Sequence, residues 1–210
     1  MIIKVCGMRE ADNVRQLTEG EAPDLMGLIF YEKSPRYVDR NSADLNFFRG
    51  LKTPKVGVFV DAEIENILQN INDFGLDYVQ LHGSESVAFI QKLKKLSRVR
   101  IIKVVKVGAE IDWEELRPFE PLVDLFLFDT QTTKFGGSGV QFDWTVLESY
   151  PLQKGFLLSG GVDEGSVEAI EALASKVPLL LGVDINSRFE TSPGVKDTVK
   201  VQRFLKMVRG

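Results

Sequence analysis

Short apolar runs alternate with amphipathic segments along the whole 210-residue chain, and this alternation constrains the fold most strongly. The runs are rich in Val, Ile, Leu or Phe, as expected for strands buried on both faces. They span residues 1–6, 25–31, 55–60, 77–82, 100–107, 124–129, 155–159 and 178–184. The segments between them repeat apolar residues at helical spacing, as Val201, Phe204 and Leu205 do near the end. The sequence therefore predicts eight strand–helix units with parallel strands.

Two architectures fit such a chain, an open doubly wound sheet and a closed barrel. The first predicted strand is followed by residues 6–10 (CGMRE), which lack the glycine-rich fingerprint of a dinucleotide-binding open sheet. Eight is also the number of units that closes the barrel. No linker or low-complexity tract divides the chain. We therefore expect one α/β domain over residues 1–210, a (β/α)8 TIM barrel around a closed, parallel eight-stranded sheet.

The composition argues against several classes of function. A formal net charge of −4 disfavours non-specific nucleic-acid binding, which needs a basic face. No apolar run approaches the roughly 18 residues that span a bilayer, and the N-terminus lacks a basic segment followed by an apolar one. The single cysteine excludes an intrachain disulfide and a cysteine-rich metal site. We expect a cytoplasmic protein that binds neither nucleic acid nor membrane, and a monomer rather than a homodimer.

Reactive side chains in such a barrel gather at the carboxyl ends of the strands. Cys6 stands at the end of the first predicted strand, and Asp129 ends the sixth. Because strand side chains alternate faces, Cys6 shares a face with Lys4, and Asp129 shares one with Leu127. We interpret the lone thiol and the strand-end acid as a base and an acid that face one pocket.

Two other strands carry polar side chains at their ends. Gln80 and His82 share a face of the fourth strand, and His82 is the single histidine of the chain. Asp184 ends the eighth strand, which a closed barrel places beside the first. We therefore expect Asp184 to lie within ion-pairing reach of Lys4.

The loops after strands seven and eight have the composition of a phosphate site. Gly160 and Gly161 follow strand seven, where glycine lets backbone N–H groups approach an anion closely. Asn186 and Ser187 follow strand eight and supply amide and hydroxyl donors. Barrel enzymes often bind phosphate in these two loops. The sequence thus predicts a small anionic ligand that carries a phosphate group.

Two further loops suggest substrate contacts. Arg36, held behind Pro35, offers a planar fork suited to a carboxylate. Residues 130–143 after strand six contain the run GGSG, and their length and glycines predict a mobile cover over the pocket.

Taken together, these motifs resemble the phosphoribosylanthranilate isomerase family of tryptophan biosynthesis. The matching stretches are KVCGM (4–8), GLIFY (27–31), KSPRY (33–37), VFV (58–60), VQLHG (79–83), DT (129–130) leading to GGSG (136–139), and LSGG (158–161). The resemblance covers the chain with all eight units in register. It implies a (β/α)8 barrel, no metal or organic cofactor, and an Amadori rearrangement of N-(5-phosphoribosyl)anthranilate.

The resemblance also implies roles for individual residues. Asp129 would be the general acid that protonates the ribose ring oxygen, and Cys6 the general base that removes the proton on C2′. The other implied substrate-binding residues are Arg36 for the anthranilate carboxylate, Gly160, Gly161, Asn186 and Ser187 for the phosphate, Asp184 for substrate or its neighbours, and His82 for the pocket wall without a proton-transfer role.

One segment departs from the family pattern. After Asp184 and one apolar residue, many members have two serines, a glycine, a valine and a glutamate, whereas this chain has NSRFE at residues 186–190. Donors at 186 and 187 survive in kind. Arg188, in place of glycine, either adds charge near the phosphate or faces solvent.

Other interpretations remain for the same residues and for the whole chain. Cys6 alone could be inert packing, Asp129 a helix cap, His82 a structural residue, and Arg36 part of a surface ion pair. Another sugar-phosphate isomerase or epimerase would use the same barrel and phosphate site; in the histidine-pathway Amadori isomerase, an aspartate is expected where Cys6 stands. A non-catalytic barrel that binds a phosphorylated ligand is the second alternative.

Overall fold

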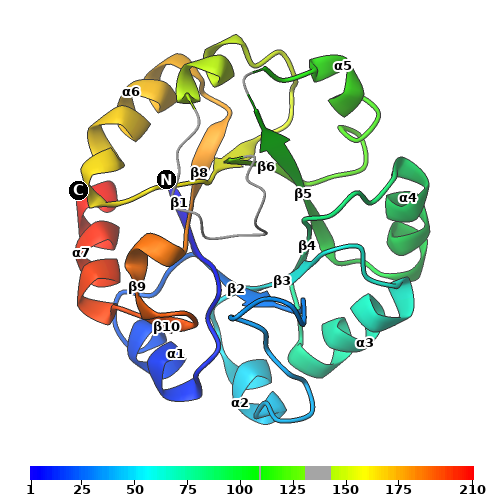
Figure 1. Ribbon diagram of the computed structural model, residues 1–210, viewed down its shortest axis with the longest axis vertical. Helices are drawn as coiled ribbons and strands as arrows, with labels where there is room; N and C mark the ends of the chain where they lie inside the picture. Colours follow the sequence, from blue (N-terminus) through cyan, green and yellow to red (C-terminus); the bar gives the residue numbers. More distant parts are fainter. Residues whose placement is uncertain (109, 131–142) are drawn as a thin grey trace.

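The computed structural model describes residues 1–108, 110–130 and 143–210, and its central feature is a closed barrel of eight parallel strands. Each strand pairs with its neighbours in sequence, and β8 closes the ring against β1 (Figure 1). The strands are β1 Ile2–Val5, β2 Leu25–Ile29, β3 Lys55–Phe59, β4 Tyr78–Leu81, β5 Arg100–Val107, β6 Leu125–Thr130, β7 Phe156–Leu158 and β8 Leu180–Ile185. All eight predicted strands are confirmed, with ends that differ by a few residues.

Helices surround the barrel on its outer side (Figure 1). The α-helices are α1 Ala11–Thr18, α2 Leu45–Gly50, α3 Ile64–Phe74, α4 Val87–Leu96, α5 Trp113–Leu116, α6 Val167–Lys176 and α7 Thr198–Arg209. Short 3-10 helices cover Trp144–Ser149, Glu164–Ser166 and Ser187–Phe189, and a hairpin of β9 Glu190–Ser192 and β10 Val195–Lys196 precedes α7.

One predicted helical unit differs from expectation. In the described part of the connection between β6 and β7, a 3-10 helix over Trp144–Ser149 stands where an α-helix was expected. Asp143 caps its start by accepting a hydrogen bond from the Thr145 N–H. Pro151 follows closely, and the residue before a proline is driven out of the α region, so the helix stops after a short run.

Side-chain alternation divides each strand between two apolar regions. One lies within the barrel and consists of Leu25, Val56, Tyr78, Ile102, Val104, Leu125, Leu127 and Leu157. Phe126 and Phe128, the chain neighbours of Leu127, belong instead to the larger cluster that strands share with helices. This confirms the predicted faces of β6 and directs Asp129, two residues after Leu127, to the barrel side.

Three aspartates hold neighbouring strands in register where the strands begin. The Asp24 carboxylate accepts a hydrogen bond from the backbone N–H of Ile3 at 2.8 Å, just before β2. Asp77 before β4 and Asp124 before β6 accept from Lys55 at 2.8 Å and Ile101 at 2.7 Å. Each bond connects an even-numbered strand to the preceding odd-numbered one. These bonds lie at the amino ends of the strands, so the polar side chains at the carboxyl ends are not needed to hold the strands together.

Two findings bear on other classes of protein. No helix among the described residues is both long and apolar enough to cross a lipid bilayer. Within the same residues, no group of three or more His, Cys, Asp or Glu side chains could hold a metal ion.

Candidate active site

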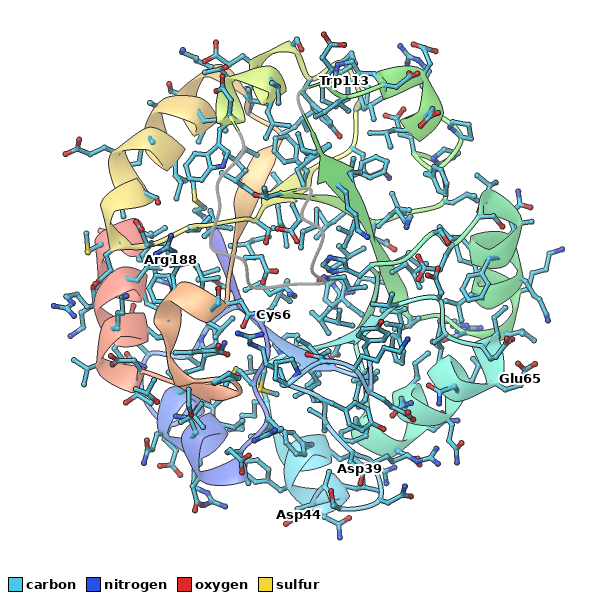
Figure 2. The ribbon with its side chains drawn as sticks, in the orientation of Figure 1. Cys6, Asp39, Asp44, Glu65, Trp113 and Arg188 are labelled. Carbon is cyan, nitrogen blue, oxygen red and sulfur yellow. The ribbon has the colours of Figure 1, made fainter. Side chains whose placement is uncertain are left out.

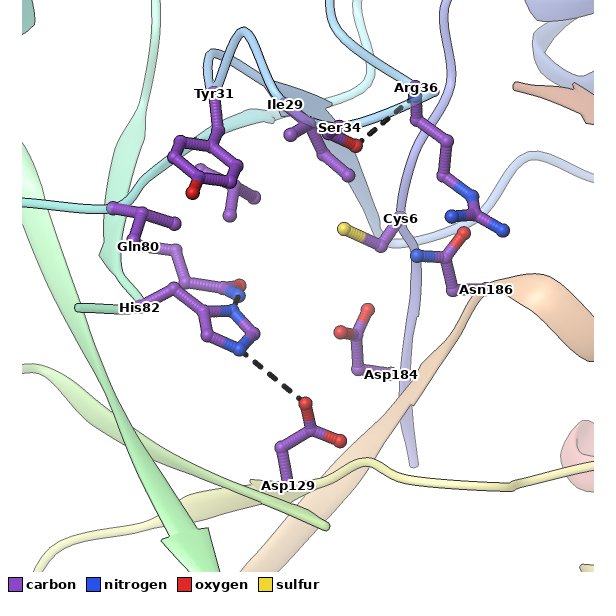
Figure 3. A pocket seen from close by; sticks show the side chains of 12 residues that line it. Cys6, Ile29, Tyr31, Ser34, Arg36, Gln80, His82, Asp129, Asp184 and Asn186 are labelled. Carbon is purple, nitrogen blue, oxygen red and sulfur yellow. Dashed lines mark hydrogen bonds and ion pairs between the residues drawn. The ribbon is translucent and has the colours of Figure 1, made fainter. Parts of the chain in front are cut away.

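A pocket opens at the carboxyl ends of the strands, and it contains both Cys6 and Asp129. The residues that line it are Cys6, Ile29, Tyr31, Ser34, Arg36, Val58, Val60, Gln80, His82, Asp129, Asp184 and Asn186. Together they enclose about 580 Å³ of space, including solvent at the open mouth. Cys6 and Asp129 reach into this space from different sides (Figure 3). The predicted meeting of thiol and acid at one pocket is confirmed.

Cys6 follows β1 directly and is almost completely buried, with 4% of its surface exposed. Its backbone N–H donates to the Ile185 carbonyl of β8 at 2.9 Å. A Cβ at Gly27 of β2 would lie 2.7 Å from the Cys6 Sγ, so glycine at that position leaves room for the thiol. Burial raises the pKa of the Cys6 thiol above its usual range, and the ammonium groups of Lys4 and Lys196 oppose this effect.

Lys4 and Asp184 form a fully buried ion pair beside the thiol. Lys4 Nζ lies 2.8 Å from Asp184 Oδ1, and the two side chains are 0% and 6% exposed. The pair arises because β1 and β8 are adjacent with Lys4 opposite Asp184. Burial lowers the pKa of Lys4, but Asp184 and Cys6 more than compensate, so its pKa lies above the usual value. The predicted ion pair is confirmed, and it places the Lys4 ammonium group next to Cys6.

Asp129 is the last member of a chain of polar side chains along the pocket wall (Figure 3). Gln80 Nε2 lies 3.2 Å from His82 Nδ1, and His82 Nε2 lies 3.5 Å from Asp129 Oδ2. With the Gln80 amide as donor, a neutral His82 ring carries its proton on Nε2, which faces Asp129. His82 therefore lines the pocket as expected and is placed to orient the carboxyl group.

Arg36 lines the pocket, but its fork already holds a carboxylate of the same chain. Arg36 Nη2 lies 2.6 Å from Glu190 Oε2, and Nε lies 2.9 Å from Oε1. Lys196 Nζ reaches Glu190 Oε1 at 2.7 Å. Burial raises the pKa of Glu190, but the two cations outweigh it and hold that pKa below its usual range. The alternative that Arg36 forms an ion pair is confirmed, but the expected surface position is wrong, because the Arg36 and Glu190 side chains are only 9% and 4% exposed.

The predicted phosphate residues lie at the ends of β7 and β8. Asn186 is one of the residues that line the pocket. Gly160, Gly161 and Ser187 are not among the described residues that line it. Gly160 and Gly161 have φ angles of +86° and +73°, a conformation that favours glycine. A Cβ at Gly160 would lie 2.9 Å from the Thr130 backbone nitrogen. These glycines therefore let the β7 loop pass close to the end of β6.

Two other predictions concern neighbouring loops. Arg188 is exposed, and Figure 2 shows it near α7 and away from Cys6. Its backbone carbonyl accepts a hydrogen bond from Lys200 at 2.6 Å. The predicted cover over residues 130–143 lies outside the described residues, except for Thr130 and Asp143 at its ends.

Sequence reasoning gave no role to Lys196 or Glu190 and singled out neither Tyr31 nor Ser34. Lys196 is completely buried, although it lies in the short strand β10 of a hairpin whose residues 191–193 are exposed. No local pattern marks such a lysine. Tyr31 and Ser34 lie in the same loop as Arg36. Their position just after the end of β2 is the sequence feature that could have identified them as pocket residues.

Comparisons with known proteins agree with this geometry. The family model for N-(5'phosphoribosyl)anthranilate (PRA) isomerase matches residues 3–207. The N-(5'-phosphoribosyl)anthranilate isomerase of Parabacteroides distasonis is 41% identical over 210 residues, which cover 99% of this chain and 93% of that protein.

Two solved structures have a similar fold over their whole length. One shows mutually generated monomers of the dimeric phosphoribosylanthranilate isomerase of Thermotoga maritima, with a TM-score of 0.83, 30% identity and full coverage of both chains. The other is a phosphoribosyl anthranilate isomerase in complex with reduced 1-(o-carboxyphenylamino)-1-deoxyribulose 5-phosphate, with a TM-score of 0.82, 30% identity and full coverage of both.

Proposed function

The chain belongs to the N-(5'-phosphoribosyl)anthranilate isomerase family, and on this premise we propose a function and an assignment of roles. The protein rearranges N-(5-phosphoribosyl)anthranilate to 1-(2-carboxyphenylamino)-1-deoxyribulose 5-phosphate in tryptophan biosynthesis. Asp129 acts as the general acid and Cys6 as the general base. The observation that carries this assignment is that both side chains line one pocket.

The first step opens the ribose ring. The protonated carboxyl group of Asp129 donates its proton to the ring oxygen, and the C1′–O bond breaks as the anthranilate nitrogen forms a protonated imine. General acid catalysis of this kind requires the acid within hydrogen-bond reach of the leaving oxygen. His82, which faces Asp129, orients the carboxyl group but exchanges no proton with the substrate.

The second step transfers a proton from carbon. The Cys6 thiolate removes the C2′ proton, and the electron pair forms the C1′=C2′ bond of an enolamine, which neutralises the imine. Protonation at C1′ and loss of the C2′ hydroxyl proton then give the ketone. Atoms and charge balance without an external oxidant or reductant.

The protonation states need assistance from the pocket. A free thiol with pKa about 8.5 and a free carboxyl with pKa about 3.9 favour the reverse distribution by roughly 6 kcal/mol. Burial of Cys6 adds to this difference, whereas Lys4 and Lys196 reduce it. The cationic imine, formed beside the thiol, also favours a thiolate.

The two ends of the substrate are held by separate groups. Arg36 retains N–H groups beyond those that bind Glu190, and these pair with the anthranilate carboxylate. Gly160, Gly161, Asn186 and Ser187 hold the phosphate, and Asp184 orients neighbouring groups. Fixing both ends places the reacting carbons between base and acid, where orientation contributes most to the rate.

The experiment follows the loss of anthranilate-type substrate fluorescence on addition of enzyme. Cys6→Ser and Asp129→Asn should each lower kcat/KM by about 100-fold or more, the usual effect of removing an acid or base. Asp12→Asn is the control, because Asp12 is 90% exposed in a pair with Arg15. Near-normal turnover by Cys6→Ser would exclude the thiolate base. Binding without turnover by the unmodified protein would favour a non-catalytic barrel.

We also propose that the active unit is a cytoplasmic monomer. The proposed acid, the proposed base and Arg36 all line this pocket, so the proposed chemistry calls for no residue from a second copy. Light scattering during size-exclusion chromatography measures the mass directly. A mass near 47 kDa, about twice the 23.5 kDa of the chain, would contradict the monomer. Fractionation of cells that produce the protein tests its location.

A further inference from the structure

A buried group of charges lies behind Arg36, and we call Arg36, Glu190 and Lys196 the Glu190 cluster. Both carboxylate oxygens of Glu190 accept hydrogen bonds from Arg36, and Oε1 also accepts one from Lys196. The Glu190 and Lys196 side chains are 4% and 0% exposed. An ion pair so deeply buried is worth little net stability compared with apolar packing, so its presence calls for another explanation.

The Glu190–Lys196 pair is held by its own surroundings, away from the pocket surface. Gly194 N–H donates to Glu190 Oε1 at 3.2 Å within the β9–β10 hairpin. Asn13 of α1 exchanges two hydrogen bonds with the Lys196 backbone, at 2.7 and 2.9 Å. Among the described residues that line the pocket, neither Glu190 nor Lys196 appears, although Arg36 does. The pair therefore acts on a substrate only through other side chains.

Glu190 fixes one edge of the Arg36 fork and leaves the rest available. Its oxygens take the Nε–H and one N–H of Nη2. Because the guanidinium is planar, holding this edge sets the direction of the remaining N–H groups, which are the second of Nη2 and both of Nη1. The pocket side of Arg36 is thus preorganised to accept a further carboxylate.

Lys196 orients a second side chain of the pocket. Its Nζ lies 2.7 Å from Asn186 Oδ1. An ammonium group only donates hydrogen bonds, so the Asn186 atom that faces it must be the carbonyl oxygen. The amide N–H groups of Asn186 are then directed away from Lys196. One buried cation therefore determines that Asn186 presents donors, which suits an anionic ligand.

We propose that the Glu190–Lys196 ion pair is a positioning pair that aims Arg36 and Asn186 at the two anionic ends of the substrate. This inference rests on the proposed function for the assignment of Arg36 to the substrate carboxylate. The cluster contains two cations and one anion, so its net charge is +1. This charge attracts an anionic ligand even though Glu190 is already paired within the protein. Glu190 thus directs the Arg36 fork without cancelling the attraction of the cluster for a carboxylate.

The test compares two substrates that differ in one group, N-(5-phosphoribosyl)anthranilate and the corresponding phosphoribosyl aniline without the carboxylate. Glu190→Gln should raise KM for the first substrate by about tenfold or more and leave kcat within about threefold. Without Glu190 the Arg36 fork is no longer held toward the substrate carboxylate, and this contact contributes equally to the bound substrate and to the transition state. KM for the aniline should change little. A loss of folded protein would instead reduce activity toward both substrates equally.

Glu114→Gln is the matched control. Glu114 also receives Arg117 Nε on both oxygens, at 2.8 and 3.0 Å, but the Glu114 side chain is 75% exposed on α5. This variant removes the same kind of pair and should leave KM for both substrates unchanged.

Arg36→Met separates failure of the inference from failure of the proposed function. If Arg36→Met raises KM equally for both substrates, Arg36 does not bind the carboxylate and the proposed function loses that assignment. In the other case, Arg36→Met raises KM only for the substrate with the carboxylate, while Glu190→Gln leaves that KM unchanged or lowers it. This result overturns only the inference, because Glu190 then competes with the substrate carboxylate for the Arg36 guanidinium. Should Glu190→Gln not fold, Glu190→Asp retracts the carboxylate and is expected to give the same selective rise in KM.

Discussion

Replacing Lys4 with methionine should destabilise the barrel strongly, and replacing Asp184 at the same time should cost less than the two single effects together. The two groups are 2.8 Å apart, with side chains 0% and 6% exposed. At an effective dielectric constant of about 20, opposite charges at this distance attract by about 6 kcal/mol before desolvation is counted. Removing one partner of a buried pair typically costs about 3–5 kcal/mol, because the other charge is left uncompensated.

Methionine suits this experiment because its length is close to that of the lysine stem, so little cavity is created. We therefore expect Lys4→Met to lower the free energy of unfolding by about 3–5 kcal/mol. In Lys4→Met/Asp184→Asn no buried charge remains from the pair. The double variant should be more stable than the sum of the single effects predicts, by about 1–3 kcal/mol.

The assay is urea unfolding of the parent, both single variants and the double variant, which form a double-mutant cycle. An unchanged m-value would show that the variants unfold from equally compact native states. The same proteins test the proposed base, because loss of the Lys4 cation should raise the pKa of the Cys6 thiol and so move the pH dependence of kcat toward higher pH. A loss below about 1 kcal/mol in Lys4→Met, typical of an exposed pair, would refute this account of the interior.

Three further changes test other parts of the structure. Gly160→Ala should lower the melting temperature and raise KM, since a Cβ there meets Thr130 Oγ1 and the residue adopts a φ of +86°, which costs a non-glycine residue about 1–2 kcal/mol; calorimetry and kinetics measure the two effects. The folded-state pKa of Glu190 lies below the ordinary 4.5, so its stabilisation is complete above about pH 4.5 and disappears as the pH falls through the folded value. Denaturation at several pH values should therefore show a parent–Glu190→Gln difference that shrinks in acid, and a constant difference would contradict the shift. Asp197→Ala removes the acceptor of the Lys200 N–H at 3.0 Å and should cost about 1 kcal/mol in urea unfolding, whereas no loss would mean that α7 does not depend on its cap.

Much of the fold follows from local regularities of the sequence. Strands buried on both faces must be apolar throughout, so they are visible as short runs, and eight of them close a barrel. The alternation of side chains along β6 is equally local, and it placed Asp129 on the same face as Leu127 before any contact was known. The adjacency of the first and eighth strands, a consequence of closure, brought Lys4 opposite Asp184.

The polar partners behind the pocket could not be derived in this way. Glu190 lies 154 positions from Arg36 in the chain, and no sequence period links them. The pattern of residues alone is enough to place a thiol and a carboxyl group at strand ends of one barrel, with an arginine in the loop after β2. The folded arrangement was needed to show that Arg36 is held by Glu190, that Lys196 is buried between Glu190 and Asn186, and that His82 faces Asp129. Strand periodicity is set by the geometry of neighbouring residues, whereas the partner of a buried charge depends on how distant loops pack and on which groups must share the cost of leaving water.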